Sequence, residues 1–182
     1  GKGTGVQPEN NGRLFDFTRD FQTVRYYLQL AADDNPDAPA GRLVANLMRQ
    51  VNQDPAQSIV RGVERFDVRY AVEDDLGRTR YLDADEVDNR AGGSISCPPG
   101  SPNPLGGTDP GCLWRSVKSI EVNLLLDSVD AMASLAPSEL RYMYPPDGAS
   151  AQTPPSSMTN GLDRNMMRRG FTFVVAVRGY NP

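Results

Sequence analysis

The clearest pattern in the chain is an alternation of apolar and polar residues that begins shortly after Gly62. One side of this extended segment carries the apolar residues Phe66, Val68, Tyr70 and Val72. The other side carries the charged residues Arg65, Asp67 and Arg69. A period of two predicts a half-buried antiparallel strand whose apolar side is covered. Because a strand interior tolerates glycine poorly, we expect a bend or bulge at Gly62.

Other stretches repeat the alternation and predict further strands. An early strand is expected at residues 24–30, a long one at residues 117–126 and a last one at residues 171–177. The long strand should turn Ile120, Val122, Leu124 and Leu126 inward and Glu121 and Asn123 outward. The last strand should contribute to the core the side chains of Phe171, Phe173, Val175 and Val177. The pattern therefore predicts an antiparallel sheet domain, and by itself it defines no function.

Shorter elements are expected between these strands. Residues 73–78 should connect a hairpin to a return strand at residues 79–82, residues 83–89 should form a helical turn, and residues 128–136 a short helix. Residues 42–53 are ambiguous, because their apolar residues recur at helical spacing. These residues are Leu43, Val44, Leu47, Met48 and Val51.

The two cysteines, Cys97 and Cys112, enclose a segment so rich in proline and glycine that we expect neither helix nor strand in it. A disulfide would remove on the order of 3 kcal/mol of unfolded-chain entropy. Two free thiols are the alternative, and zinc is a poor one because the chain has no histidine. We expect the disulfide, which implies an oxidising compartment such as a periplasm. Trp114 should form a lid over a sheet edge beside it.

Length and composition limit the number of domains and the kinds of partner. The 182 residues suit one domain, which we place at residues 21–182 after an irregular lead-in or added residues at 1–20. A net charge of −4 argues against nucleic acid as a partner. No window approaches the roughly 20 apolar residues that a membrane-spanning helix needs.

Motifs for catalysis or ion binding are missing. Without histidine the chain lacks the commonest general base and metal ligand. The acidic turn at residues 33–37 offers oxygen ligands for calcium but not the spacing of an EF-hand loop, so a solvated turn is favoured. Acidic pairs such as Asp74 and Asp75 suit exposed turns better than a glycosidase site. We therefore expect no enzyme, no cofactor, no metal and no small-molecule substrate.

Three blocks of sequence resemble one family. Residues 57–70 resemble the Q-x-L-V-E-G-V-E-x-L-x-V-x-Y segment of PilW-type minor pilins of bacterial type IV pili, with Arg61 in place of the usual acidic residue. Residues 117–126 resemble the V-x-x-V-R-V-x-L-L-x strand of that family, and residues 167–178 its terminal R-R-x-F-T-x-x-V-A-L-R-N-R run. The blocks follow the family order. The main matching positions are Val60, Gly62, Val63, Glu64, Phe66, Val68, Tyr70, Arg168, Arg169, Phe171, Thr172, Val175, Ala176, Val177 and Arg178.

The resemblance implies an α+β fold, mostly antiparallel sheet with sandwich or Greek-key character and little helix. Family placement also favours a strand over a helix at residues 42–53. The implied role is structural: a minor-pilin ectodomain that contacts other minor pilins and the major pilin during pilus assembly, in priming or at the tip. It implies that the domain lies on the periplasmic side and is anchored in the inner membrane by an N-terminal helix that is missing from this sequence. It also implies that the matching residues are structural motif positions.

Two alternatives remain open. J-type pseudopilins of type II secretion share a glycine-valine-glutamate step before a similar strand, so the resemblance fits them as well. An adhesin-like tip subunit would instead bind a surface through its loops, chiefly the cysteine-bounded loop and residues 148–160. Many PilW-like sequences carry an aspartate-glycine repeat resembling a calcium loop near residues 73–78. Leu76 and Arg78 interrupt that pattern here, so no calcium site is carried over.

Overall fold

The computed structural model describes residues 22–38, 40–97, 111–130, 132, 134–154 and 165–177. The predicted lead-in at 1–20, most of the cysteine-bounded loop, residues 155–160 of the second loop and Arg178 lie outside these ranges. The strands are β1 (Val24–Ala32), β2 (Leu43–Val51), β3 (Gln57–Arg61), β4 (Val63–Glu73), β5 (Thr79–Leu82), β6 (Val117–Asp127) and β7 (Arg168–Ala176). The short helices are α2 (Ala84–Asp88), α3 (Arg90–Gly93), α4 (Cys112–Arg115) and the 3-10 turn η1 (Pro145–Asp147).

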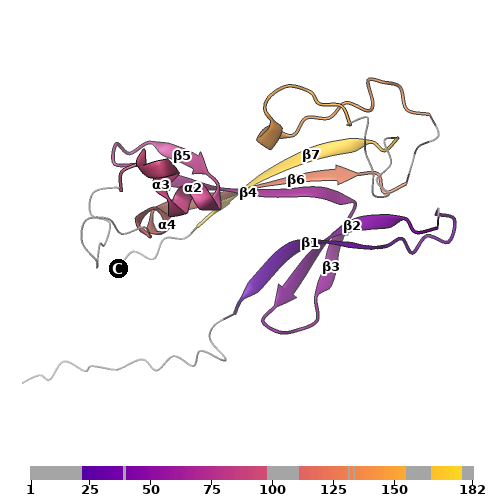
Figure 1. Cartoon of the computed structure of the whole chain (residues 1–182), viewed down its shortest axis with the longest axis horizontal. Helices are drawn as coiled ribbons and strands as arrows, with labels where there is room; N and C mark the ends of the chain where they lie inside the picture. The colour runs from indigo at the N-terminus through magenta and orange to yellow at the C-terminus, as the bar shows by residue number, and fades with distance from the viewer. Residues whose placement is uncertain are drawn as a thin grey trace, which may run out of the picture.

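The strands form two antiparallel sheets, shown in Figure 1. The first has the order β1-β2-β3 and the second the order β5-β4-β6-β7. This architecture confirms the predicted α+β class with mostly antiparallel sheet and little helix. Residues 42–53 contain a strand, as family placement favoured, because β2 pairs with β1 on one side and with β3 on the other. Backbone pairing on both sides outweighs the helical spacing of its apolar residues.

Gly62 forms the corner between the two sheets, and the predicted bend is confirmed there. Its φ is +74°, and the pairing of β4 with β6 shifts register between Val63 and Arg65. The Gly62 N–H donates to the carbonyl of Ala45 in β2, and its own carbonyl accepts from Asp127 N–H in β6, both at 2.8 Å. One glycine therefore hydrogen-bonds to both sheets.

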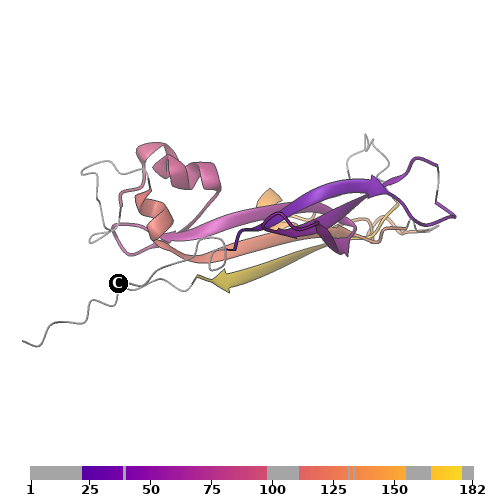
Figure 2. The same ribbon diagram turned by 90° about the horizontal axis from the view of Figure 1, so that it is seen from below.

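Helices α2, α3 and α4 gather at one end of the four-stranded sheet, as Figures 1 and 2 both show. Helix α2 begins with a capping box in which Asp83 accepts from Glu86 N–H and Glu86 accepts from Asp83 N–H. Beneath these helices lies a buried cluster made of Val72, Leu82, Val87, Ile95, Cys112 and Leu113. This end of the sheet is therefore closed by an apolar core.

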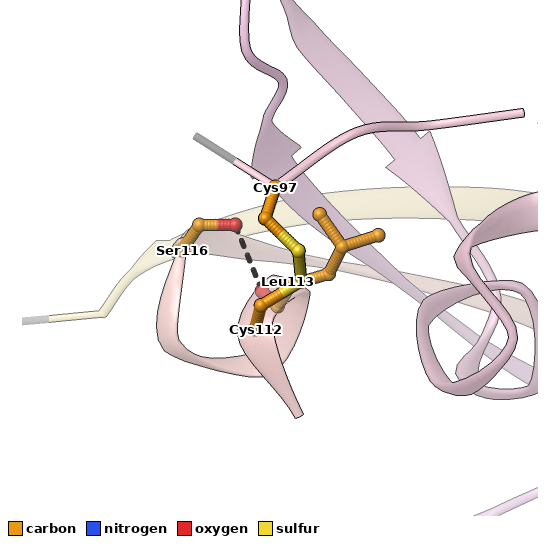
Figure 3. The surroundings of a disulfide bond; sticks show 4 residues. All are labelled: Cys97, Cys112, Leu113 and Ser116. Carbon is orange, nitrogen blue, oxygen red and sulfur yellow. Dashed lines mark hydrogen bonds between the residues drawn. A yellow bond between two sulfur atoms is a disulfide. The ribbon is translucent and has the colours of Figure 1, made fainter. Parts of the chain in front are cut away.

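A disulfide joins Cys97 and Cys112 and fixes α4 onto this cluster (Figure 3). The Ser116 hydroxyl donates to the Leu113 carbonyl at 2.9 Å and closes the C-terminal end of α4. Trp114 packs edge-on against Tyr70, with ring centroids 4.7 Å apart, and its indole N–H donates to Asp88. Its ring therefore lies against the β4 residue Tyr70.

Three sequence predictions about β6, β7 and the segment after β6 are wrong. The side chain of Asn123 is buried rather than outward-facing, because Tyr144 covers it. The last strand is exposed rather than part of the core, because no described residue covers Phe171, Phe173 or Val175. The described part of residues 128–136 contains no helix, because local hydrogen bonds of Asp127 and Ser128 side chains hold a turn there.

Candidate functional site

One face of the four-stranded sheet is apolar across three neighbouring strands. Cross-strand partners share a face, and the register aligns three rows of three residues across β4, β6 and β7. The rows are Tyr70–Ile120–Val175, Val68–Val122–Phe173 and Phe66–Leu124–Phe171. We call these nine side chains the apolar face. It contains no charged and no hydrogen-bonding group except the Tyr70 hydroxyl.

The β7 side of this apolar face is open to solvent. Phe171, Phe173 and Val175 are 43%, 51% and 55% exposed, and the β4 and β6 members are only half-buried. The helical end of the sheet covers one margin, where Tyr70 contacts Trp114. The expectation that the alternating apolar side of β4 would be covered thus holds fully for Val72 beneath the helices and in part for Phe66 and Val68, which are half-buried.

The opposite face of the same sheet is polar and is covered by Tyr144, which is fully buried. The Tyr144 hydroxyl donates to Asp67 at 2.5 Å and lies 3.1 Å from the carbonyl of Asn123. Burial raises the pKa of Tyr144 above its ordinary value, and the hydrogen bond to Asp67 raises it further. Thr172, the cross-strand partner of Asn123 in β7, donates to the Asn123 side chain at 2.7 Å.

Arg65 fixes the segment that carries Tyr144. Its guanidinium donates to both carboxylate oxygens of Asp147 at 2.6 and 2.7 Å and lies 4.5 Å from the centroid of the Tyr144 ring. Asp67 lies 3.3 Å away on the same strand. The two faces are therefore different: one is covered in its middle by Tyr144 and a hydrogen-bonded network, and the other is apolar and exposed along β7.

A buried ion pair ties β4 to β7 near the corner. Arg168 donates to both carboxylate oxygens of Glu64 at 2.8 and 2.6 Å, and the two side chains are 1% and 6% exposed. Asp127 lies beside them. Desolvation, with Glu64 adding to it, raises the pKa of Asp127 to about 6, although Val129 N–H and Arg168 act in the opposite direction.

The two acidic turns that the sequence suggested for calcium are occupied by arginine. Asp33 is not solvated as expected: its side chain is 2% exposed and lies 3.4 Å from Arg42 and 3.2 Å from Arg61. Burial tends to raise the pKa of Asp74, but hydrogen bonds from Arg78, Leu76 and Arg80 lower it below its ordinary value. Asp74 is also buried rather than exposed as expected, because its carboxylate accepts hydrogen bonds inside its own turn, so both carboxylates act as acceptors that hold turns in place.

The structure brings some of the family-motif residues together and separates others. Glu64 meets Arg168, while Phe66, Val68, Tyr70, Phe171 and Val175 share the apolar face. Val63 is fully buried, Val60 is half-buried in β3, and Ala176 pairs with Ser119. Arg169 is exposed at the start of β7, and Val177 donates its N–H to the Lys118 carbonyl.

The sequence analysis did not predict the hydrogen bonds that join Tyr144 to Asp67 and Asn123. Asn123 was their one visible signal, because an amide inside an apolar strand has to find hydrogen-bond partners when it is buried. Tyr144 and Asp147 gave no such signal, since they reach the sheet only through the fold of residues 134–154.

The described residues contain no group of three cysteine or acidic side chains placed to hold a metal ion, and no helix among them is long and apolar enough to cross a membrane. The feature that remains is a surface: an antiparallel sheet with one face covered in its middle by a polar network and the other face apolar and exposed along β7.

These features define a β-rich domain with an uncovered apolar sheet face. The family model Type IV Pilus-assembly protein W matches residues 25–179, which is most of the chain. The chain therefore belongs to this PilW family, and the resemblance found in the sequence is confirmed. No curated protein and no solved structure matched the chain. Membership implies a role in type IV pilus assembly and a location in the cell envelope.

Proposed function

We propose that this chain is the outward domain of a minor pilin that binds other minor pilins and the major pilin. In this proposal it belongs to the complex that primes pilus growth and stays at the tip. Residues 21–182 act as one periplasmic domain, held at the inner membrane before incorporation. Its role is structural, and it supports pilus-dependent behaviour such as twitching motility through assembly rather than catalysis.

The observation that carries this proposal is the open apolar face. Monomeric soluble proteins rarely expose a large contiguous apolar patch, and such patches mark protein or membrane contacts. Here nine apolar side chains lie on one face of the sheet, with the β7 members about half exposed. Contact with another pilus subunit would remove this surface from water. Burial of one such side chain stabilises by roughly 1.5–3 kcal/mol.

The motif residues fit the same proposal as structural supports. The Glu64–Arg168 pair is almost fully desolvated and ties β4 to β7 near the corner, on the face of the sheet opposite the apolar face. Breaking one partner of such a pair leaves a buried charge without its counterion, which costs about 3–5 kcal/mol. We infer that these two residues hold the outer strand in register so that the rows of the apolar face stay aligned.

The test places a charge on the apolar face. Phe173→Glu should weaken binding of the chain to ectodomains of the other minor pilins of the same pilus system by about tenfold or more, because a carboxylate would be buried without a partner. Pull-down and calorimetry measure binding, and counts of surface pili measure assembly in cells that carry the variant. Leu76→Glu is the matched control, because Leu76 is 68% exposed and lies in the β4–β5 turn away from the face.

Thermal unfolding and circular dichroism check that both variants fold. The proposed function is overturned if Phe173→Glu and Leu76→Glu bind and piliate like the unaltered protein. It is also overturned if a clean deletion of the gene leaves piliation normal.

A further inference from the structure

The outer strand β7 leaves one edge of the four-stranded sheet open. Its inner edge pairs with β6 from Arg168 to Ala176, and the sheet order places no strand beyond it. Within the described ranges no backbone hydrogen bond reaches this outer edge. Figure 2 shows β7 along the margin of the sheet, on the side away from the helices. Among the described residues, the backbone donors and acceptors on this edge of β7 from Thr172 to Ala176 therefore have no partner.

The hydrogen bond of Val177 fixes which backbone groups point outward. Its N–H donates to the Lys118 carbonyl at 2.9 Å, so Val177 points its backbone groups toward β6. Backbone groups of an antiparallel strand alternate between its two edges. The N–H and carbonyl groups of Thr172, Val174 and Ala176 therefore point away from β6, toward the open edge.

This edge lacks the devices that usually prevent strand addition. Proteins guard edges with short strands, charges, prolines or bulges. The opposite edge strand, β5, has four residues and carries Arg80, and β3 has five residues with Arg61 at its end. Strand β7 has nine residues, its pairing with β6 shows no register shift, and residues 170–177 contain neither charge nor proline. Of the two edges of the four-stranded sheet, β7 is therefore the unprotected one, and the other long edge strand, the nine-residue β1, belongs to the three-stranded sheet.

The side chains of β7 indicate what kind of segment could pair with this edge. Arg169 is exposed at the start of β7 and forms no salt bridge within the described residues. The residues after it on the same face, Phe171, Phe173 and Val175, are apolar. An added strand would therefore need apolar side chains beside these three residues and a carboxylate beside Arg169.

We propose that an extended segment of another pilus subunit adds to β7 as a fifth strand of this sheet. This inference rests on the proposed function, because it names how one partner binds. The added backbone bonds to the outward groups of Thr172, Val174 and Ala176, its apolar side chains extend the apolar face, and its carboxylate pairs with Arg169. Main-chain bonds supply affinity and the side chains supply selectivity.

The test measures amide hydrogen exchange of the full 182-residue chain by NMR. The probe is the purified ectodomains of the other minor pilins of the same pilus system, added one at a time. We expect the amides of Thr172, Val174 and Ala176 to exchange fast in the unbound chain and about tenfold or more slower with the partner that binds. The amides of Phe173 and Val175 already bond to β6 and serve as internal controls.

Two substitutions separate the edge from the face. Val174→Pro removes one outward N–H and leaves the β6 ladder intact, so it should weaken binding about tenfold, whereas Val174→Thr should not. Arg169→Glu should weaken binding more than Arg169→Gln, because it opposes the partner carboxylate. If Val174→Pro does not fold, the comparison of Arg169→Glu with Arg169→Gln and the exchange measurement still test the inference.

Each other outcome overturns the inference in a recognisable way. Binding without slower exchange at the three outward amides means that a partner covers the face alone, and the proposed function then stands. Slower exchange that depends on the concentration of this chain without any partner means that a second copy occupies the edge. Absence of binding in every arm overturns both the inference and the proposed function.

Discussion

Asp127 shows at the scale of one residue how burial changes a charge. It ends β6, accepts from Val129 N–H at 2.7 Å and lies beside the Glu64–Arg168 pair. Its pKa is raised from 3.8 to about 6, first by desolvation and then by the nearby Glu64. The folded state therefore binds this proton more tightly than the unfolded state. The resulting contribution to stability is present below the unfolded pKa and is lost as pH rises through about 6.

Asp127→Asn should remove this pH dependence. The amide resembles the protonated carboxyl, since it still accepts from Val129 N–H and carries no charge. The unfolding free energy of the variant minus that of the unaltered protein should grow as pH rises from about 4 to about 6 and then stay constant. Urea unfolding at a series of pH values measures this difference. Asp75→Asn, at an exposed turn position, is the control and should give a flat difference; a flat difference for Asp127→Asn would contradict the prediction.

At the scale of the element, α4 depends on its disulfide. The helix has four residues, which is too short to be stable without tertiary contacts, and its N-terminal residue is Cys112. The bond to Cys97 and the burial of Leu113 hold it against the apolar cluster under the helices. The only tryptophan of the chain, Trp114, lies in this helix and packs on Tyr70.

Replacing both cysteines by serine should lower the unfolding free energy by about 3 kcal/mol, since it releases a loop of about 15 residues in the unfolded chain. The fluorescence of Trp114 should shift to longer wavelength, because α4 loosens and the ring becomes more hydrated. The far-ultraviolet circular dichroism of the sheets should change little. A reductant should reproduce these effects on the unaltered protein and have none on the double variant. Unchanged stability and fluorescence would show that packing holds α4 without the bond.

At the scale of the whole molecule, Gly62 connects the two sheets. Its positive φ turns the chain from β3 into β4, and its backbone bonds to Ala45 and to Asp127 join the sheets. A Cβ at this position would lie 2.7 Å from the Asp127 carboxylate and 2.8 Å from a methyl of Val129. The corner therefore excludes every side chain.

Gly62→Ala should lower the unfolding free energy by about 2 kcal/mol or more, because it adds steric overlap to the roughly 1–2 kcal/mol cost of a left-handed conformation. Gly77→Ala is a matched control, because Gly77 has the same φ of +74° with no atom within 4 Å of an added Cβ. Urea unfolding of both variants isolates the steric part of the loss in unfolding free energy. Equal losses for the two variants would show that the corner can relax around a methyl group.

The period-two pattern was sufficient to locate strands but not to say what covers them. It placed β1, β4, β6 and β7 correctly, because backbone alternation is a local property. It failed for Asn123 and Phe171, since the amide was taken as exposed and the phenylalanine as buried. Their environments depend on Tyr144, about 20 residues from Asn123, and on the absence of any described cover over β7. Such cover is decided by contacts between distant segments.

The sequence by itself determined the antiparallel strands, the bend at Gly62 and the resemblance to the pilin family, because each of these is encoded by neighbouring residues. Only the tertiary structure decided that Tyr144 covers the middle of one face of the four-stranded sheet, that Glu64 meets Arg168, and that no described residue pairs with the outer edge of β7. These features join residues as many as 104 positions apart. A contact over such a distance depends on the path of the whole chain, and no local pattern encodes it.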